Sequence, residues 1–269
     1  MTGLSTLRRR SSVDALDAGA LAALRAAWTG MLALEDERGF LHWAGLHGLP
    51  LPSYCQHGTP LFLPWHRAYL YFFEQFLLDQ GTDATLPWWD WSARTGVPAS
   101  YVGETLPDGA ANPLASGPVS RIPDGQFARA GLPPVDRTYR QPDDPVVLPG
   151  PDQVSDVLGA ADFTDFTARV EDLHNGVHLW VGGTMGVIPV AAYDPLFWAH
   201  HAMVDRLWYL WQLGHPGGTP DAAILDTALA PFSMTVRETL DIATLGYDYS
   251  ATVATGTPAA AAPDEESGS

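Results

Sequence analysis

The sequence predicts a mainly α-helical single domain with long loops and few short strands. Two segments carry this prediction, WHRAYLYFFEQFLLDQG at 65–81 and DPLFWAHHAMVDRLWYLWQLG at 194–214, because their apolar residues recur at helical spacing. A proline near the start and a glycine at the end bound each segment, as helix ends prefer. With 269 residues, of which 46% are apolar, the chain can bury one large core.

The N-terminal elements follow in chain order. Residues 14–46 have apolar side chains at helical spacing, and we expect a helix that Ser12 or Asp14 caps. A proline-containing loop then covers 48–64 and leads into the first of the two strong helices.

The C-terminal half begins less regularly. Residues 96–150 are rich in Pro, Gly and Asp, which indicates extended loops with a short strand or two, and 151–181 are predicted to be helical. We expect residues 1–250 to form one domain, with no C-terminal lid domain. The small and polar residues 251–269 are expected to be a disordered tail.

The charge of the chain excludes some classes of partner. It has 31 acidic residues against 14 basic ones, a net charge of -17, and every basic residue is Arg. Such a balance repels nucleic acid and anionic membranes. No apolar run reaches the roughly 18 residues of a membrane span. Asp14, Asp17 and Arg25 interrupt the only stretch that resembles a secretion signal, so a cytoplasmic location is favoured.

A polar helix face stands out in VEDLHNGVH at 170–178. Glu171, His174, Asn175 and His178 fall on one face, and their apolar neighbours indicate that it is buried. Buried polar groups need partners, and a metal is one solution. A zinc protease would need Glu where Asn175 stands, and a di-iron site would need a second Glu-x-x-His. A set of imidazoles suits Cu, Zn, Fe or Ni.

Two further histidines are adjacent in the second strong helix. His200 and His201 point about 100 degrees apart, so at most one of them can join the same metal. Asp205 lies on the face of His201 and is expected to hold the other nitrogen of that ring. For His200 we favour a packing or hydrogen-bonding role outside the first coordination sphere.

The N-terminal half contributes a second group of histidines. His66 begins a helix and points inward, and His57 lies in the preceding loop. His42 and His47 diverge on a helix, so only one of them is expected to join, and His215 is expected at the surface in a turn. Two groups of about three imidazoles thus emerge. Three neutral nitrogens leave coordination positions open, and two such sites facing each other could bind O2 between them.

The chain resembles a known family in a set of ordered segments. These are AGLHGLP, YCQHGTPLFLPWHRAYLYFFEQ, LPWWDWS, LHNGVHLWVGG, DPLFWAHHAMVDRLWYLWQ and LGYDYS, which together span most of 40–250. In their order and spacing they resemble the tyrosinase family of binuclear type-3 copper proteins. The resemblance implies a central four-helix bundle that holds two copper ions, with O2 as cosubstrate.

The resemblance also implies a ligand set and a cross-link. The first copper would take His47, His57 and His66, and the second would take His174, His178 and His201. Cys55, the only cysteine, matches a residue that forms a thioether to a copper ligand in the fungal branch of the family. The expected bond joins Cys55 to His47; the alternative is a small buried thiol.

Residues for chemistry and access follow from the same resemblance. Glu171 and Asn175 match a pair that holds a water thought to deprotonate the incoming phenol; alternatively, Glu171 only orients a ligand. Leu179, Val187 and Ile188 are expected to line the entrance. None of them is the bulky Phe that covers one copper in some catechol oxidases, so an open site is expected.

The implied function is copper-dependent hydroxylation of monophenols to o-diphenols and oxidation of o-diphenols to o-quinones. The alternatives are an oxidase of catechols or o-aminophenols without hydroxylase activity and, more remotely, an O2 carrier of the hemocyanin type. The expected partners are small phenolic substrates. Copper would enter either unaided or with the help of a chaperone.

Overall fold

The computed structural model describes residues 7–129, 131, 133 and 135–249. Their α-helices are α1 Ala18–Ala33, α2 Phe40–His47, α3 Phe62–Leu78, α4 Asp124–Arg129, α5 Pro151–Leu158, α6 Phe163–Val181, α7 Ile188–Ala191 and α8 Pro195–Gly214. Single 3-10 turns, such as η1 Val13–Ala15 and η5 Gly183–Gly186, separate them, and the two strands are β1 Arg8–Arg10 and β2 Tyr247–Tyr249. The mainly helical fold with long loops is confirmed. The expected tail at 251–269 lies outside the described residues.

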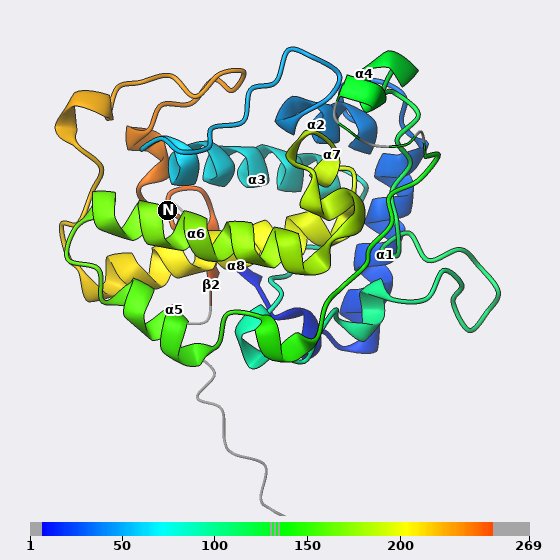
Figure 1. The fold of residues 1–269 in the computed structure, drawn as a ribbon, viewed down its shortest axis with the longest axis horizontal. Coiled ribbons are helices and arrows are strands. Elements are labelled where there is room, and N and C mark those ends of the chain that lie inside the picture. The colour runs from blue at the N-terminus through cyan, green and yellow to red at the C-terminus, as the bar shows by residue number, and fades with distance from the viewer. Residues whose placement is uncertain (1–6, 130, 132, 134, 250–269) are drawn as a thin grey trace, which may run out of the picture.

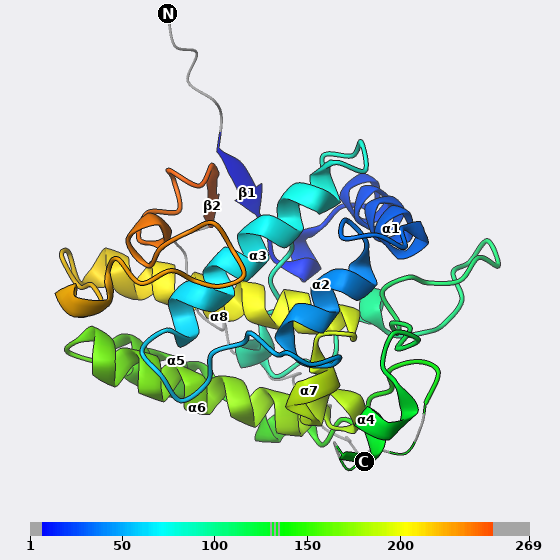
Figure 2. The ribbon, with the colours of Figure 1, turned by 90° about the horizontal axis from the view of Figure 1, so that it is seen from above.

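The centre of the molecule is a helical bundle made of α2, α3, α6 and α8. Helix α3 packs against α8 and α6, and α6 packs against α8. Figures 1 and 2 show α2 beside α3, on the side away from α5. Both strong helices of the sequence lie in this bundle, and α8 is buried along nearly its whole length. Asp194 caps α8, because its side chain accepts a hydrogen bond from Leu196 N at 2.9 Å.

The predicted helix over 14–46 is interrupted, which corrects the sequence interpretation. It forms η1, α1 and α2, and Asp17 caps α1 by accepting from Ala20 N at 2.8 Å. Between α1 and α2 the Asp36 side chain accepts from Arg38 N, a local bond that competes with the helix. Gly39 then approaches Leu34 so closely that a Cβ would overlap the Leu34 carbonyl oxygen. Periodicity alone does not reveal such a break.

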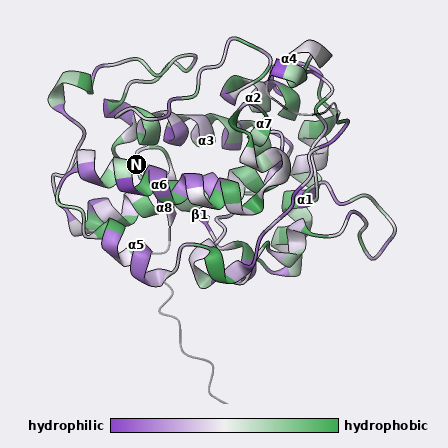
Figure 3. Ribbon diagram, viewed as in Figure 1, coloured by the Kyte–Doolittle hydropathy of each residue, from purple (hydrophilic) through white to green (hydrophobic). Residues whose placement is uncertain are grey.

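The middle of the chain wraps the bundle as loops. Within the described part of 96–150 the regular elements are α4 and two 3-10 turns, with isolated bridges in place of the expected short strands. The predicted helix over 151–181 is divided into α5 and α6, with Asp162 as the cap of α6. Hydrophilic and hydrophobic residues alternate along α6 (Figure 3), as a half-buried helix requires.

The two ends of the described chain are joined by a feature that the sequence interpretation missed. Strands β1 and β2 pair in parallel, with Arg10 opposite Tyr249. Arg10 is fully buried and forms ion pairs with Glu74 of α3 and Asp205 of α8. This network fixes the first residues of the domain to the bundle. No helix of the described residues is long and apolar enough to cross a membrane.

Candidate metal centre

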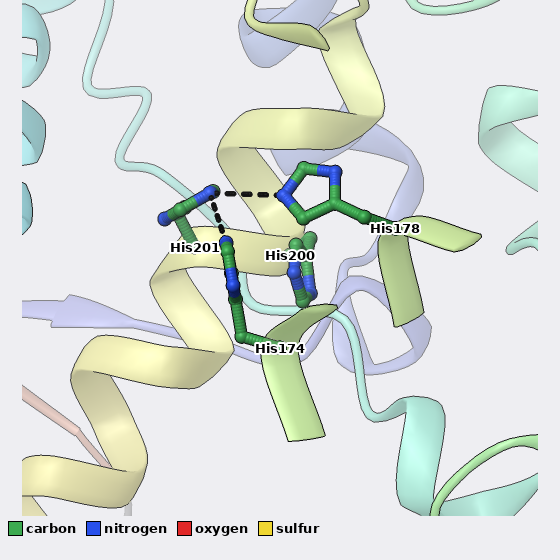
Figure 4. Close-up of side chains that lie close together, drawn as sticks. All are labelled: His174, His178, His200 and His201. Carbon is green, nitrogen blue, oxygen red and sulfur yellow. Dashed lines mark hydrogen bonds between the residues drawn. The ribbon is translucent and has the colours of Figure 1, made fainter. Parts of the chain in front are cut away.

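Three imidazole nitrogens converge between α6 and α8. The Nε2 atom of His201 lies 3.2 Å from Nε2 of His174 and 3.4 Å from Nε2 of His178 (Figure 4). Two nitrogens that bind one ion at about 2.0–2.1 Å in a tetrahedral arrangement lie about 3.3 Å apart. The spacing of these three nitrogens therefore fits a single metal ion with a coordination position left open.

A second group of imidazoles adjoins the first. His47 is the last residue of α2, His57 lies in the loop and His66 lies in the first turns of α3. Their ring centroids are 5.2 to 5.6 Å apart. The two groups meet where the rings of His66 and His201 stack at 4.6 Å. The packing of α3 against α8 thus brings together side chains that are more than a hundred residues apart in sequence.

Hydrogen bonds fix the orientation of several rings. Nδ1 of His66 donates to the Phe62 carbonyl at 2.8 Å, and Nδ1 of His178 donates to the Met185 carbonyl at 2.9 Å. With Nδ1 occupied by a carbonyl, the Nε2 lone pair faces the centre, which is the usual arrangement of metal-binding histidines. Nε2 of His66 is buried and has no hydrogen-bond partner among the described residues. A buried polar atom of this kind calls for a ligand.

Burial keeps these imidazoles neutral. It lowers the pKa of His57 to about 4, and it lowers the pKa of His178 to about 4 against a smaller opposing effect of the Met185 carbonyl. For His174 and His201 burial and the neighbouring rings lower the pKa well below 6.5. A metal binds the unprotonated ring, so these groups are ready to bind at neutral pH without first losing a proton.

Glu171 and Asn175 lie next to this cluster. Glu171 accepts a hydrogen bond from Gly58 N at 2.7 Å, which links α6 to the loop just after His57. Asn175 Oδ1 lies 3.2 Å from Nδ1 of His174. Burial raises the pKa of Glu171, and the bond from Gly58 opposes that rise. The carboxylate and the amide therefore stand beside both groups of histidines.

Comparisons with known proteins agree with this geometry. Residues 37–213 match the family model described as the common central domain of tyrosinase. The chain belongs to the tyrosinase family. A tyrosinase of Streptomyces glaucescens is 37% identical over 209 residues, covering 66% of this chain and 74% of that protein.

Oxygen-carrier sequences also match this tyrosinase-family chain. A G-type hemocyanin of Enteroctopus dofleini is 32% identical over 232 residues, 78% of this chain but only 8% of that multi-unit protein. A solved functional unit of octopus hemocyanin has a TM-score of 0.75 and 28% identity, covering 90% of this chain and 67% of that chain.

Tyrosinase-family proteins hold two copper ions, and the residues of this chain fit that requirement. The imidazole donors are the kind that copper prefers. Ligand atoms of His174, His178 and His201, with a fourth from His200, lie within 4.8 Å of one another, as do those of His47, His66 and His201. The histidine clusters therefore fit copper sites.

Asp205 differs from its expected role. Its carboxylate accepts hydrogen bonds from Arg67 Nε at 2.5 Å and from the hydroxyls of Tyr247 and Tyr249 at 2.8 and 2.7 Å. These partners and Arg10 turn it away from the histidines. Nδ1 of His201 is buried without a hydrogen-bond partner among the described residues. The expected pair of Asp205 and His201 is therefore wrong, because helical spacing gave no sign of the arginines that compete for the carboxylate.

The histidines outside the two groups occupy different surroundings. His200 is fully buried and stacks on His174 at 5.1 Å, which agrees with a packing role, although neither of its ring nitrogens has a hydrogen-bond partner in the described part of the chain. His42 packs edge-on against Trp43, away from the centre. His215 caps the end of α8 and stacks on Trp211, so it is less exposed than expected.

Cys55 lies beside the first group of histidines. Its Sγ is within 4.8 Å of a ring nitrogen of both His47 and His57. Burial raises the pKa of the thiol, and a hydrogen bond with Ser53 at 3.4 Å opposes that rise. The cross-link to His47 stays a prediction, and His57 is equally within reach.

The three residues expected at the entrance differ in exposure, and their role there stays a prediction. Leu179 is 72% exposed and Ile188 is 45% exposed, while Val187 is half-buried between η5 and α7. Sequence reasoning missed Phe197, one turn before His201, whose ring lies 4.0 Å from that of His201 and 4.8 Å from that of His47. The four-residue spacing between Phe197 and His201 on one helix could have indicated that the two side chains share a face. Phe197 is fully buried and separates the centre from the core.

Proposed function

We propose that the protein hydroxylates monophenols to o-diphenols and oxidises o-diphenols to o-quinones with O2. The observation that carries this proposal is the pair of adjoining groups of buried histidines. We further propose that the exposed side chains of Leu179 and Ile188 flank an open approach to them. An enzyme must admit a phenol ring to its metal ions, whereas a carrier needs to admit only O2. The relatives named tyrosinase support the same conclusion.

We assign one copper to His47, His57 and His66 and the other to His174, His178 and His201. The spacing of the Nε2 atoms and the neutral state of the rings support this assignment. When bound, the two ions supply the redox chemistry with O2. The protein orients the ligands through carbonyls such as those of Phe62 and Met185. It also excludes water from the inner side with Phe197.

Glu171 and Asn175 are proposed to handle the proton of the substrate. A phenol must lose its hydroxyl proton as it enters, and a carboxylate held beside the centre can accept that proton through one water. The bond from Gly58 N fixes one carboxylate oxygen and leaves the other available. Asn175 would hold the water from the other side. In the alternative role Glu171 only positions the loop that carries His57.

Two other functions compete with this proposal. An oxidase of catechols or o-aminophenols would have the same copper ligands but no hydroxylation of monophenols. An O2 carrier is favoured by one observation, the similarity to hemocyanin units. The proposed open approach speaks against the carrier, because the stored O2 of a carrier must be kept from reducing substrates.

A panel of substrates separates the three functions. Copper-loaded protein is given tyramine with a trace of reductant, and separately dopamine and 2-aminophenol. Turnover of tyramine and dopamine is the expected result. Turnover of dopamine without turnover of tyramine would overturn the proposed hydroxylation of monophenols. Reversible O2 binding with no turnover of any substrate would indicate an O2 carrier.

A further inference from the structure

A cavity of about 350 Å³ lies beside the metal centre, between the outer face of α6 and the loop after His57. Gly58, Thr59 and Pro60 line one wall. The α6 wall extends over about three helical turns and consists of Thr164, Thr167, Ala168, Glu171, Asp172 and Asn175. None of the six histidines lines this cavity, but it adjoins their centre through Asn175, which contacts His174, and through Gly58, which follows His57 and bonds to Glu171.

The lining has carboxylates and no base. Glu171 and Asp172 are its charged residues. Asp172 is exposed and forms no ion pair with another described residue, unlike Asp165, which pairs with Arg169. A cleft with charges of one sign and low-dielectric walls raises the local concentration of the opposite charge. The whole chain, with a net charge of -17, adds to this field.

A hydroxyl deeper in the same cavity lacks a partner. Thr167 is only 6% exposed, and its Oγ1 atom is buried without a hydrogen bond to any described residue. A buried hydroxyl without a partner costs stability. Since Thr167 lines the cavity one turn before Glu171, a donor that entered the cavity could satisfy this hydroxyl.

The dimensions suit the side chain of a phenol. Asn175 beside His174 and Asp172 are three residues apart, which is about 4.5 Å along the helix axis. A two-carbon chain that ends in an ammonium group spans a similar length. A ring at the metal centre could therefore place its ammonium group at the level of Asp172 and Glu171. Thr167 lies one turn beyond Glu171 on the same face of α6, where a water bound to the ammonium group could reach its hydroxyl.

We propose that this cavity is an ammonium subsite and that the enzyme prefers phenols with a cationic alkylamine chain, such as tyramine, over neutral or carboxylate-bearing phenols. The inference rests on the proposed function and adds the class of substrate. Asp172 contacts the substrate chain directly and Thr167 acts on it through the water, so both determine specificity without touching the reacting ring.

The test compares three phenols that share the ring and differ in the charge of the chain. These are tyramine, 4-ethylphenol and 3-(4-hydroxyphenyl)propanoate, assayed with the copper-loaded protein at neutral pH. We expect kcat/KM to fall in that order and the preference for tyramine to shrink in about 1 M salt, where the Debye length is about 3 Å. Equal values, or a preference for the carboxylate, would overturn the proposal.

Variants assign the preference to the cavity. Asp172→Asn is expected to lower the ratio of tyramine to 4-ethylphenol about two- to fivefold, which is the size of one exposed charge pair. Thr167→Val is expected to lower the same ratio. Asp83→Asn, an exposed residue outside this cavity with the same change of charge, serves as the matched control and should leave the ratio unchanged. An unchanged ratio in Asp172→Asn would contradict the assignment.

A binding measurement separates this proposal from the proposed function. Saturation-transfer NMR on the copper-free protein is expected to show tighter binding of tyramine than of 4-ethylphenol, and Asp172→Asn should remove the difference. If the copper-loaded protein oxidises no phenol but this difference is present, the subsite holds and the proposed function fails. If 4-ethylphenol is oxidised but tyramine binds no more tightly than 4-ethylphenol, the ammonium subsite is contradicted and the proposed function is not.

Discussion

At the scale of single residues, the centre depends on neutral imidazoles aimed at a common point. His201 is the hub, because its Nε2 lies within 3.4 Å of the Nε2 atoms of both His174 and His178 and its ring stacks on that of His66. Replacing one ligand of three leaves a site with too few donors to hold its ion. The other group keeps all three of its histidines.

His201→Ala is therefore expected to lower the copper content from about two ions to about one per chain and to abolish turnover of both monophenols and diphenols. Copper is measured by mass spectrometry after dialysis. His42→Ala is the control, because His42 is half-buried but lies outside both groups. Two retained coppers in His201→Ala would contradict the assignment.

The proposed proton acceptor gives a second prediction. Glu171→Gln and Asn175→Asp should lower kcat for tyramine by about 10²-fold, the lower limit of what a positioned base contributes. Turnover of dopamine should change by less, since a catechol gives up its first proton more readily. If both substrates lose activity equally in Glu171→Gln while the copper content is normal, Glu171 only positions the loop after His57.

The single thiol gives a third prediction. A thioether between Cys55 and a histidine carbon requires the loss of two hydrogens, which O2 at the copper site accepts. Intact mass of the copper-loaded protein should fall accordingly, and Cys55 should resist alkylation after unfolding. Because both rings are near Sγ, peptide mapping is then needed to show whether His47 or His57 carries the bond. An unchanged mass with a reactive Cys55 would rule out the bond.

At the scale of elements, a buried ionic network joins strands β1 and β2 to helices α3 and α8. Burial alone would raise the pKa of Asp205, but the charges of Arg67 and Arg10 and the hydrogen bonds from Arg67 and Tyr249 lower it below 3.8. Removing one partner of a buried pair leaves the other charges uncompensated, which costs about 3–5 kcal/mol. The network thus couples the pairing of the two ends to the carboxylates of Glu74 and Asp205.

Asp205→Asn should lower the free energy of unfolding of the copper-free protein by about 3–5 kcal/mol at neutral pH. Because the folded pKa is depressed, this contribution is present above the unfolded pKa of about 3.9 and is lost as the pH falls through the folded value. Urea denaturation followed by Trp fluorescence should therefore show the gap between the two proteins closing in acid.

Asp248→Asn is the control for this network. Asp248 pairs with Arg9 at the surface, where the Arg9 side chain is 62% exposed, so its loss should cost less than about 1 kcal/mol. Equal stability of the wild type and Asp205→Asn at neutral pH would show that the network does not stabilise the fold.

The elements also show what a sequence can and cannot predict. Helices α3 and α8 were predictable, because Pro and Gly bound a strong apolar period in each. The break before α2 was not, because it depends on the approach of Gly39 to Leu34. The six candidate ligands lie in two groups that meet, and their assignment to copper stays a prediction. The partner of Asp205 was missed, since Arg10 and Arg67 come from distant elements.

At the scale of the whole molecule, the centre exists only because the two halves of the chain fold together. Helices α2 and α3 bring the first group of histidines, and α6 and α8 bring the second, as Figure 2 shows for the helices. Spacing along the chain predicted each group but not their meeting, which follows from the packing of α3 on α8. Two ions held by the proposed ligands would be placed to bind O2 jointly, as the proposed function requires.

The most direct measurement of this central claim is anomalous diffraction at the copper edge from crystals of the copper-loaded protein. We expect two peaks per chain, one among the Nε2 atoms of His174, His178 and His201 and one among the ring nitrogens of His47, His57 and His66. A single peak, or two peaks that lie away from these nitrogens, would contradict the account.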